Sequence, residues 1–308
     1  MTELLARNCC ALVPACPPLG CLSNFPGRDT IDPVRAPACC PGAWPTFTLR
    51  LLGGFALEDT KGKGAVHLPQ RRAEALLALL AVAGDLSCSR DRIVALLWPE
   101  ADEAHARHNL RDTLHAIRLG LGHDAVLGSG DALRLDASVV SCDVQQFAAA
   151  LAASHLAEAV AMYRGPMLDG FHVPDAPEFE HWMDDERARL FRDCQGAIKR
   201  LAKTAEREGR WDEAAEWWAR AVAMDRYNSR FVARRIVALA RGGDRANAIK
   251  EGEAHCQSLK SELELDPDAA FLEELDRIRG GTWPARYFTP SAVRLPPGPS
   301  EPPGAKKP

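Results

Sequence analysis

The chain has 308 residues, of which 46% are apolar, and this is enough material for two globular domains with buried cores. Its net charge of −4 divides as 0 over residues 1–46, −1 over 47–140, −6 over 141–282 and +3 over 283–308. No segment is basic enough to coat nucleic acid non-specifically, and no apolar run approaches the roughly 18 residues of a membrane span, so we expect a soluble protein that does not contact a membrane.

Proline and cysteine concentrate at the ends of the chain. Eight of the 22 prolines fall in residues 1–46 and eight more in 283–308, and because neither segment has apolar periodicity we interpret both as disordered extensions. Six of the ten cysteines precede residue 41, and the other four are scattered singly through periodic segments, which favours a reducing, cytoplasmic compartment. For the first segment, a cleaved leader ending at Cys21, a metal site in the cysteine cluster and a start codon assigned too early are the alternatives. Its prolines argue against the leader, and the lack of a CxxC pair argues against the metal.

Residues 47–140 change from a strand pattern to a helix pattern and back. Alternation predicts short strands at residues 47–51, 55–57 and 65–68. Apolar residues at helical spacing then predict three helices: one from Pro69 to Gly84, one capped by Ser89 and stopped at Pro99, and one capped by Asp102 that ends at Gly120–Gly122. A β-hairpin over residues 125–135 follows. Strands, three helices and a hairpin in this order indicate a winged helix-turn-helix domain of the α+β class.

The third of these helices carries a cationic face beside its apolar stripe. With Arg107 at zero on a helical wheel, Arg118 falls at about 20°, Arg111 at about 40° and His115 at about 80°, while the apolar stripe centres at about −60°. A helix laid in the major groove of DNA needs this arrangement, because one side is anchored in the domain and the next offers long donors to base edges. Arginines on the hairpin and on the first helix could contact the DNA backbone. The candidate DNA-binding residues are Arg107, His108, Arg111, His115, Arg118, Arg134, Arg71 and Arg72.

These residues can also be interpreted without DNA binding. The arginines could simply solvate the exposed side of an amphipathic helix. His105 and His108 are three residues apart, as metal ligands can be, but no cysteine or suitable acid completes a site. The sequence has no GxSxG, HExxH or strand-linked GxGxxG motif, so we expect neither an enzyme nor a bound cofactor or metal.

Residues 142–282 are predicted to be helical almost throughout. The stretch that begins at Gly209 recurs 34 residues later at Gly243, and 34 residues is the length of a tetratricopeptide (TPR) repeat. The final helix is expected to have Asp266 as its N-cap. Trp217 and Trp218 lie about 100° apart on one helix, so we expect one to be buried and the other to be partly exposed. The predicted fold is therefore mainly α: a winged helix, an all-α TPR-like domain and disordered ends.

Residues 47–282 resemble the SARP transcription regulators, in which an OmpR-type winged helix precedes a bacterial transcriptional activator domain (BTAD). The winged-helix part of the resemblance is carried by Leu68-Pro69-Gln70-Arg71-Arg72-Ala73-Glu74-Ala75-Leu76-Leu77, Leu96-Leu97-Trp98-Pro99, Ala106-Arg107, Leu110-Arg111, Leu114 and Ile117-Arg118. The BTAD part is carried by Cys142-Asp143-Val144, Tyr163-Arg164-Gly165, Leu168-Asp169-Gly170-Phe171 and Phe179-Glu180-His181-Trp182.

The resemblance implies an activator that binds promoter direct repeats in double-stranded DNA as a homodimer and contacts RNA polymerase through its helical domain. It implies that the third helix enters the major groove and that the hairpin is the wing. It carries over to Arg107, Arg111, Arg118 and Arg134, whereas His108 and His115 are less usual at their positions and leave the base preference open. The alternative function is a TPR-like protein-interaction scaffold without sequence-specific DNA binding, which the acidic composition favours slightly.

Overall fold

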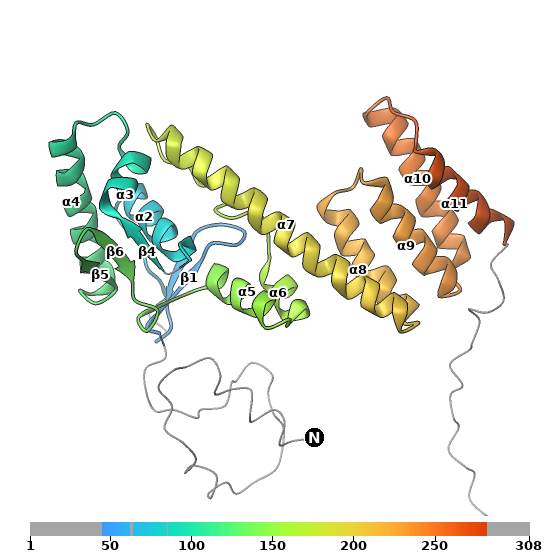
Figure 1. The fold of residues 1–308 in the computed structure, drawn as a ribbon, viewed down its shortest axis with the longest axis horizontal. Coiled ribbons are helices and arrows are strands. Elements are labelled where there is room, and N and C mark those ends of the chain that lie inside the picture. The colour runs from blue at the N-terminus through green and yellow to red at the C-terminus, as the bar shows by residue number, and fades with distance from the viewer. Residues whose placement is uncertain (1–44, 62–63, 85, 282–308) are drawn as a thin grey trace, which may run out of the picture. The chain divides into compact units, whose positions relative to one another are not determined.

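The structure, a computed structural model, describes residues 45–281 except 62–63 and 85 (Figure 1). The predicted disordered extensions therefore lie outside the described residues, apart from Pro45 and Thr46. The first part of the described chain contains β1 (Phe47–Arg50), β2 (Ala56–Asp59), β3 (Gly64–Ala65), α2 (Arg71–Val82), β4 (Ser87–Ser89), α3 (Arg90–Leu97), α4 (Glu103–Leu121), β5 (Val126–Ser129), β6 (Ala132–Leu135) and β7 (Val140–Cys142). Three strands, three helices and a hairpin occur in the predicted order.

Two small sheets frame the three helices. The first has the strand order β3-β2-β1-β7: β1 pairs antiparallel with β2, placing Leu49 opposite Leu57, and pairs parallel with β7, placing Leu49 opposite Cys142. The second has the order β4-β6-β5 and extends the hairpin by one strand. The sequence pattern missed β4 and β7, because three residues are too few to show alternation.

Local chemistry sets the ends of α3 and α4 where the sequence predicts them. The Ser89 hydroxyl accepts a hydrogen bond from the Arg92 N–H at 3.3 Å, and the Asp102 carboxylate accepts one from the His105 N–H at 3.0 Å. At its other end α4 stops at Gly122, whose φ of +89° suits glycine. Both predicted N-caps are confirmed.

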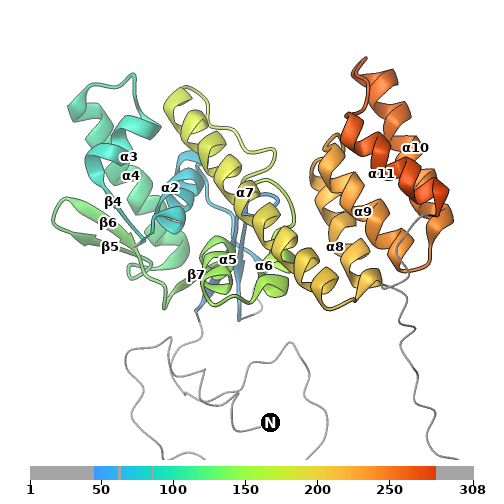
Figure 2. The same cartoon turned by 45° about the vertical axis from the view of Figure 1, so that its right-hand side comes forward.

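The rest of the described chain is helical. It contains α5 (Asp143–Ala152), α6 (Leu156–Met162), α7 (Pro177–Arg207), α8 (Trp211–Met224), α9 (Ser229–Arg241), α10 (Arg245–Glu262) and α11 (Ala269–Gly280). α7 packs against α3 and, further along its length, against α8 (Figures 1 and 2). α8 packs on α9, α9 on α10, and α11 on both α9 and α10.

The predictions about single residues on these helices are partly correct. Ala214 of α8 and Ala248 of α10, which the 34-residue period equates, are both fully buried. Trp218 is buried and Trp217 only partly so, as predicted. The prediction of Asp266 as the N-cap of the last helix is wrong: α11 starts after Asp268, whose carbonyl accepts the N–H groups of Phe271 at 3.0 Å and Leu272 at 3.1 Å.

The end of β1 is tied to the helical part by a cluster of hydrogen bonds. The carboxylate of Asp143, the first residue of α5, accepts the N–H groups of Leu51 at 2.9 Å and Leu52 at 3.0 Å. The Leu51 carbonyl accepts the Leu168 N–H at 2.8 Å, and the Arg187 guanidinium of α7 donates to the Leu168 carbonyl at 2.7 Å. The predicted boundary between residues 140 and 141 falls inside β7, and buried side chains form one core from Phe47 to Ala238.

We expect Asp143→Ala to lower the free energy of unfolding by roughly 1–3 kcal/mol, because it leaves two buried backbone N–H groups without an acceptor. Asp143→Asn keeps one acceptor oxygen and should cost less. Urea unfolding of both variants measures this, with the exposed Asp169→Ala as the control. A loss for Asp143→Ala no larger than that of the control would contradict the structural role of this carboxylate.

A second, smaller core lies among the last three helices and contains Val232, Ile236, Ala248, Phe271 and Leu275. His255 of α10 lies beside it, with its ring 5.1 Å from that of Phe271 and its Nε2 3.0 Å from the Ser229 hydroxyl. Burial lowers the pKa of His255 below its ordinary value, because the charged imidazolium would lose its hydration.

This pKa shift predicts a loss of stability in acid. The unfolded chain takes up the proton on His255 more readily than the folded chain, so the free energy of unfolding should fall as the pH drops through about 6.5, the value for an unfolded histidine. One linked proton limits this contribution to about 1.4 kcal/mol per pH unit. Denaturant unfolding between about pH 7.5 and pH 5.5 should show a steeper fall for the wild type than for His255→Gln. Equal slopes would show that His255 is not the responsible group.

Candidate nucleic-acid interface

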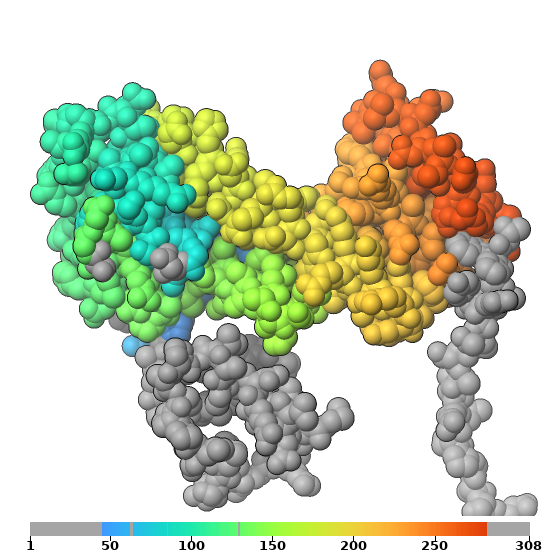
Figure 3. All heavy atoms as spheres, in the orientation of Figure 1, coloured from blue at the N-terminus to red at the C-terminus, as the bar shows by residue number. Residues whose placement is uncertain are grey.

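α4 has one buried face and one solvent-facing face. Its buried residues are Ala106, Leu110, Thr113, Leu114, Ala116, Ile117 and Leu121, and the Thr113 hydroxyl is satisfied by the Asn109 carbonyl at 2.8 Å. Arg107, His108, Arg111 and His115 are exposed. In the space-filling view, atoms of α4 lie at the surface of the molecule (Figure 3). The helix is therefore fixed by its apolar side and presents its cationic side to solvent.

The cations of this face differ in how far they are already paired. Arg107 lies 2.7 Å from the Glu103 carboxylate and 3.8 Å from that of Asp91. His108 lies 3.4 Å from the Asp112 carboxylate. The Arg111 Nε donates to the Arg107 carbonyl at 3.2 Å, and within the described part of the chain no acidic side chain pairs with Arg111. Arg111 is thus the most available guanidinium on this face.

Arg118 is placed differently from the other cations of α4. It is only partly exposed, and its buried Nε has no hydrogen-bond partner among the described residues. A buried N–H without an acceptor is unfavourable, and this cost sets Arg118 apart from the exposed cations of the helix. The neighbouring Leu119 is 75% exposed.

Arg134 lies on β6 of the hairpin, where it is exposed and stands opposite Ser87 of β4 and Leu127 of β5. Gly130, with φ +58°, allows the tight turn between β5 and β6. The hairpin therefore offers one cation on an element separate from α4, as a wing would.

Arg71 and Arg72 lie at the start of α2 and are engaged within the protein. The Arg71 guanidinium pairs with Glu74 at 3.1 Å and lies 5.2 Å from the centre of the Phe171 ring. Arg72 donates to the carbonyls of Leu97 at 3.1 Å and Pro174 at 3.0 Å. Sequence reasoning missed these contacts, because the segment that contains Phe171 and Pro174 is about 100 residues away along the chain.

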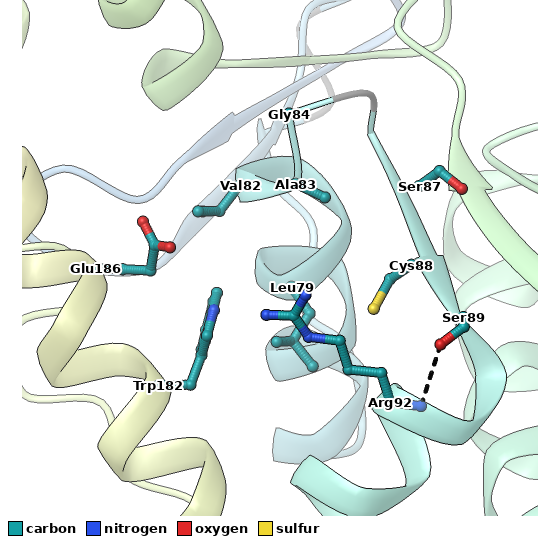
Figure 4. A pocket seen from close by; sticks show the side chains of 10 residues that line it. All are labelled: Leu79, Val82, Ala83, Gly84, Ser87, Cys88, Ser89, Arg92, Trp182 and Glu186. Atoms are coloured by element: carbon teal, nitrogen blue, oxygen red, sulfur yellow. Dashed lines mark hydrogen bonds between the residues drawn. The ribbon is translucent and has the colours of Figure 1, made fainter.

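Other kinds of site receive little support from the described residues. No group of three or more His, Cys, Asp or Glu side chains in the described ranges could hold a metal ion. None of the helices in that part of the chain is long and apolar enough to cross a membrane. A hollow of about 330 Å³ lies between the C-terminal turn of α2, β4, the start of α3 and α7 (Figure 4). It is lined by Trp182, Glu186 and Arg92 among others.

The comparison with protein families bears on the helical part. Residues 131–279 match the model of the bacterial transcriptional activator domain. The match covers 149 of the 308 residues. It runs from the hairpin through β7 and into α11, so the BTAD shares the strand that pairs with β1. With the winged-helix elements in front of it, this BTAD confirms the resemblance to the SARP-type transcription regulators.

The comparison with solved structures supports the same fold. The chain is similar to Mycobacterium tuberculosis EmbR in complex with low affinity phosphopeptide, with 20% sequence identity and a TM-score of 0.56. The similarity covers 77% of this chain and 65% of the EmbR chain, so the chain spans about two thirds of that protein's length. No curated protein matches the sequence.

Proposed function

We propose that this SARP-type regulator binds specific promoter sequences in double-stranded DNA and activates transcription. The observation that supports this most directly is the pair of faces on α4: a row of exposed cations beside a row of buried apolar side chains. In this proposal α4 enters the major groove, the β5–β6 hairpin is the wing, and residues 47–140 form the DNA-binding domain.

Arg107 and Arg111 are one helical turn apart and would both face the floor of the groove. An arginine guanidinium can donate two hydrogen bonds to the O6 and N7 atoms of guanine, which is the commonest specific contact in the major groove. Arg111 can do so without leaving an acidic partner, whereas Arg107 must first give up Glu103. That exchange costs little, because exposed ion pairs contribute about 0–1 kcal/mol.

The acids around this face also limit non-specific binding. Glu103, Asp91 and Asp112 lie beside its cations and oppose the attraction of α4 to any phosphate backbone. Specific binding then depends on base contacts and on a few phosphate contacts, for which Arg118, Arg134, His108 and His115 are the candidates. We expect a modest salt dependence and a strong sequence dependence.

For the helical part, residues 141–282, we propose contacts with protein partners. We propose a homodimer on promoter direct repeats and a contact with RNA polymerase, as the resemblance to the SARP regulators implies, and the match to a transcriptional activator domain supports this proposal. Four successive helices pack each on the next, as in a TPR-like stack: α7, α8, α9 and α10. If the chain fails to bind DNA, the TPR-like scaffold becomes the better proposal.

We expect Arg111→Ala to weaken binding to the specific promoter fragment by about 1–3 kcal/mol if Arg111 reads a base, and to relax the preference at that base pair. Quantitative gel shift on promoter and scrambled fragments at two salt concentrations measures both effects. Arg230→Ala, which removes an exposed arginine from α9, is the matched control and should bind like the wild type.

The same measurement separates two kinds of contact. If Arg111 contacts a phosphate, affinity should fall equally on all sequences and the slope of log K against log salt should decrease by about 0.9. Unchanged affinity after the combined replacement of Arg107, Arg111 and Arg118 by alanine would refute the assignment of α4 as the recognition helix.

A further inference from the structure

Arg72 connects two parts of the protein that are distant along the chain. Its Nε donates to the carbonyl of Leu97, the last residue of α3, at 3.1 Å. Its Nη2 donates to the carbonyl of Pro174, in the segment before α7, at 3.0 Å. Its guanidinium carbon lies 5.9 Å from the centre of the Trp98 ring, and Trp98 is 7% exposed. One side chain thus holds both the end of α3 and the helical domain.

The Leu97 contact is close to the start of α4. Trp98 is the C-cap of α3, and only residues 99–101 separate it from Asp102, the N-cap of α4. The Ala101 N–H donates to the Trp98 carbonyl at 3.2 Å, so this turn is compact. A displacement of the Leu97 carbonyl would therefore pass through a short, hydrogen-bonded turn to the first residues of α4.

The Pro174 contact belongs to a well-packed part of the helical domain. Phe171 is 5% exposed, and its ring lies 6.2 Å from that of Phe179 in α7. The Val173 N–H donates to the Glu180 carboxylate at 3.0 Å. The 171–174 segment is consequently fixed to the first turn of α7. A movement of that turn would therefore displace the Pro174 carbonyl to which Arg72 donates.

At the opposite end of α2 the packing against α7 is less complete. The hollow of about 330 Å³ separates the residues Leu79 and Val82 of α2 from Trp182 and Glu186 of α7 (Figure 4). At the start of α2, by contrast, Arg72 donates directly to Pro174 in the segment before α7, while the end of α2 is bonded to α5 through Gln145.

We infer that Arg72 is a positioning residue that couples the helical domain to the recognition helix, and not a ligand of the DNA backbone. The inference rests on the proposed function, because it takes α4 as the recognition helix. Arginine suits this role because its planar group can donate in two directions at once, whereas lysine offers a single point charge. The two carbonyls engage two of the five guanidinium N–H donors and fix the orientation of the group, so a phosphate could be contacted only through the remaining three.

The test compares Arg72→Lys and Arg72→Gln with Arg71→Lys in the full chain. Amide hydrogen exchange is measured over residues 98–106 and 171–176, and affinity for promoter DNA is measured at several salt concentrations. Arg72→Lys should speed exchange in both segments and weaken DNA binding roughly tenfold. Because no phosphate contact is lost, Arg72→Gln should leave the salt slope unchanged. Arg71→Lys should leave exchange in residues 98–106 as in the wild type.

The outcomes separate this inference from the proposed function. Wild-type affinity in Arg72→Lys, together with a salt slope lowered by about 0.9 in Arg72→Gln, would identify Arg72 as a phosphate ligand and overturn the inference. Unchanged exchange in residues 98–106 would also overturn it, whatever the DNA result. If the wild type does not bind promoter DNA, the proposed function fails, and the exchange data still decide whether Arg72 couples α7 to the start of α4. Thermal unfolding of each variant verifies that it is folded.

Discussion

The carboxylate of Asp143 is the constraint on which the arrangement of the described chain depends. It accepts the N–H groups of Leu51 and Leu52 at the point where β1 ends, and it does so from the first residue of α5. Burial raises the pKa of this carboxyl, while the backbone N–H groups act in the opposite direction. The same stretch of backbone bonds to the segment before α7, since Leu51 and Gly53 pair with Leu168 and Pro166. The winged helix and the activator domain therefore share one buried junction.

This junction explains the close approach of two glycines. A Cβ atom on Gly53 would lie 3.2 Å from the Cβ atom of Arg164, and one on Gly165 would lie 3.3 Å from the Cα atom of Gly53. Gly53 also has φ +97°, a conformation that other residues rarely adopt. The Tyr163-Arg164-Gly165 motif, which the sequence connects with the activator domain, is thus a surface against which the first sheet rests.

The sequence predicts those features whose causes are local. The N-caps at Ser89 and Asp102 and the two faces of α4 follow from residues within a few positions of one another, so the main candidate site could be predicted. β4 and β7 could not, because their strand partners lie far away in the chain and three residues carry no period of their own. The contacts of Arg72 were hidden for the same reason: its two acceptors are 25 and 102 residues away. A basic residue at a helix start looks the same in sequence whether it faces DNA or a neighbouring domain.

The parallel pairing of β1 with β7 has a consequence for the order of folding during synthesis. β1 leaves the ribosome first, but its parallel partner follows only after the whole of α2, α3 and α4 has been made. The bonds from Leu51 to Leu168 delay completion further. Such long-range closure slows folding, and it prevents residues 47–140 from completing their fold before the activator domain begins to emerge. A nascent chain interrupted near residue 140 would expose one side of β1 as an unpaired edge, which is a known starting point for aggregation.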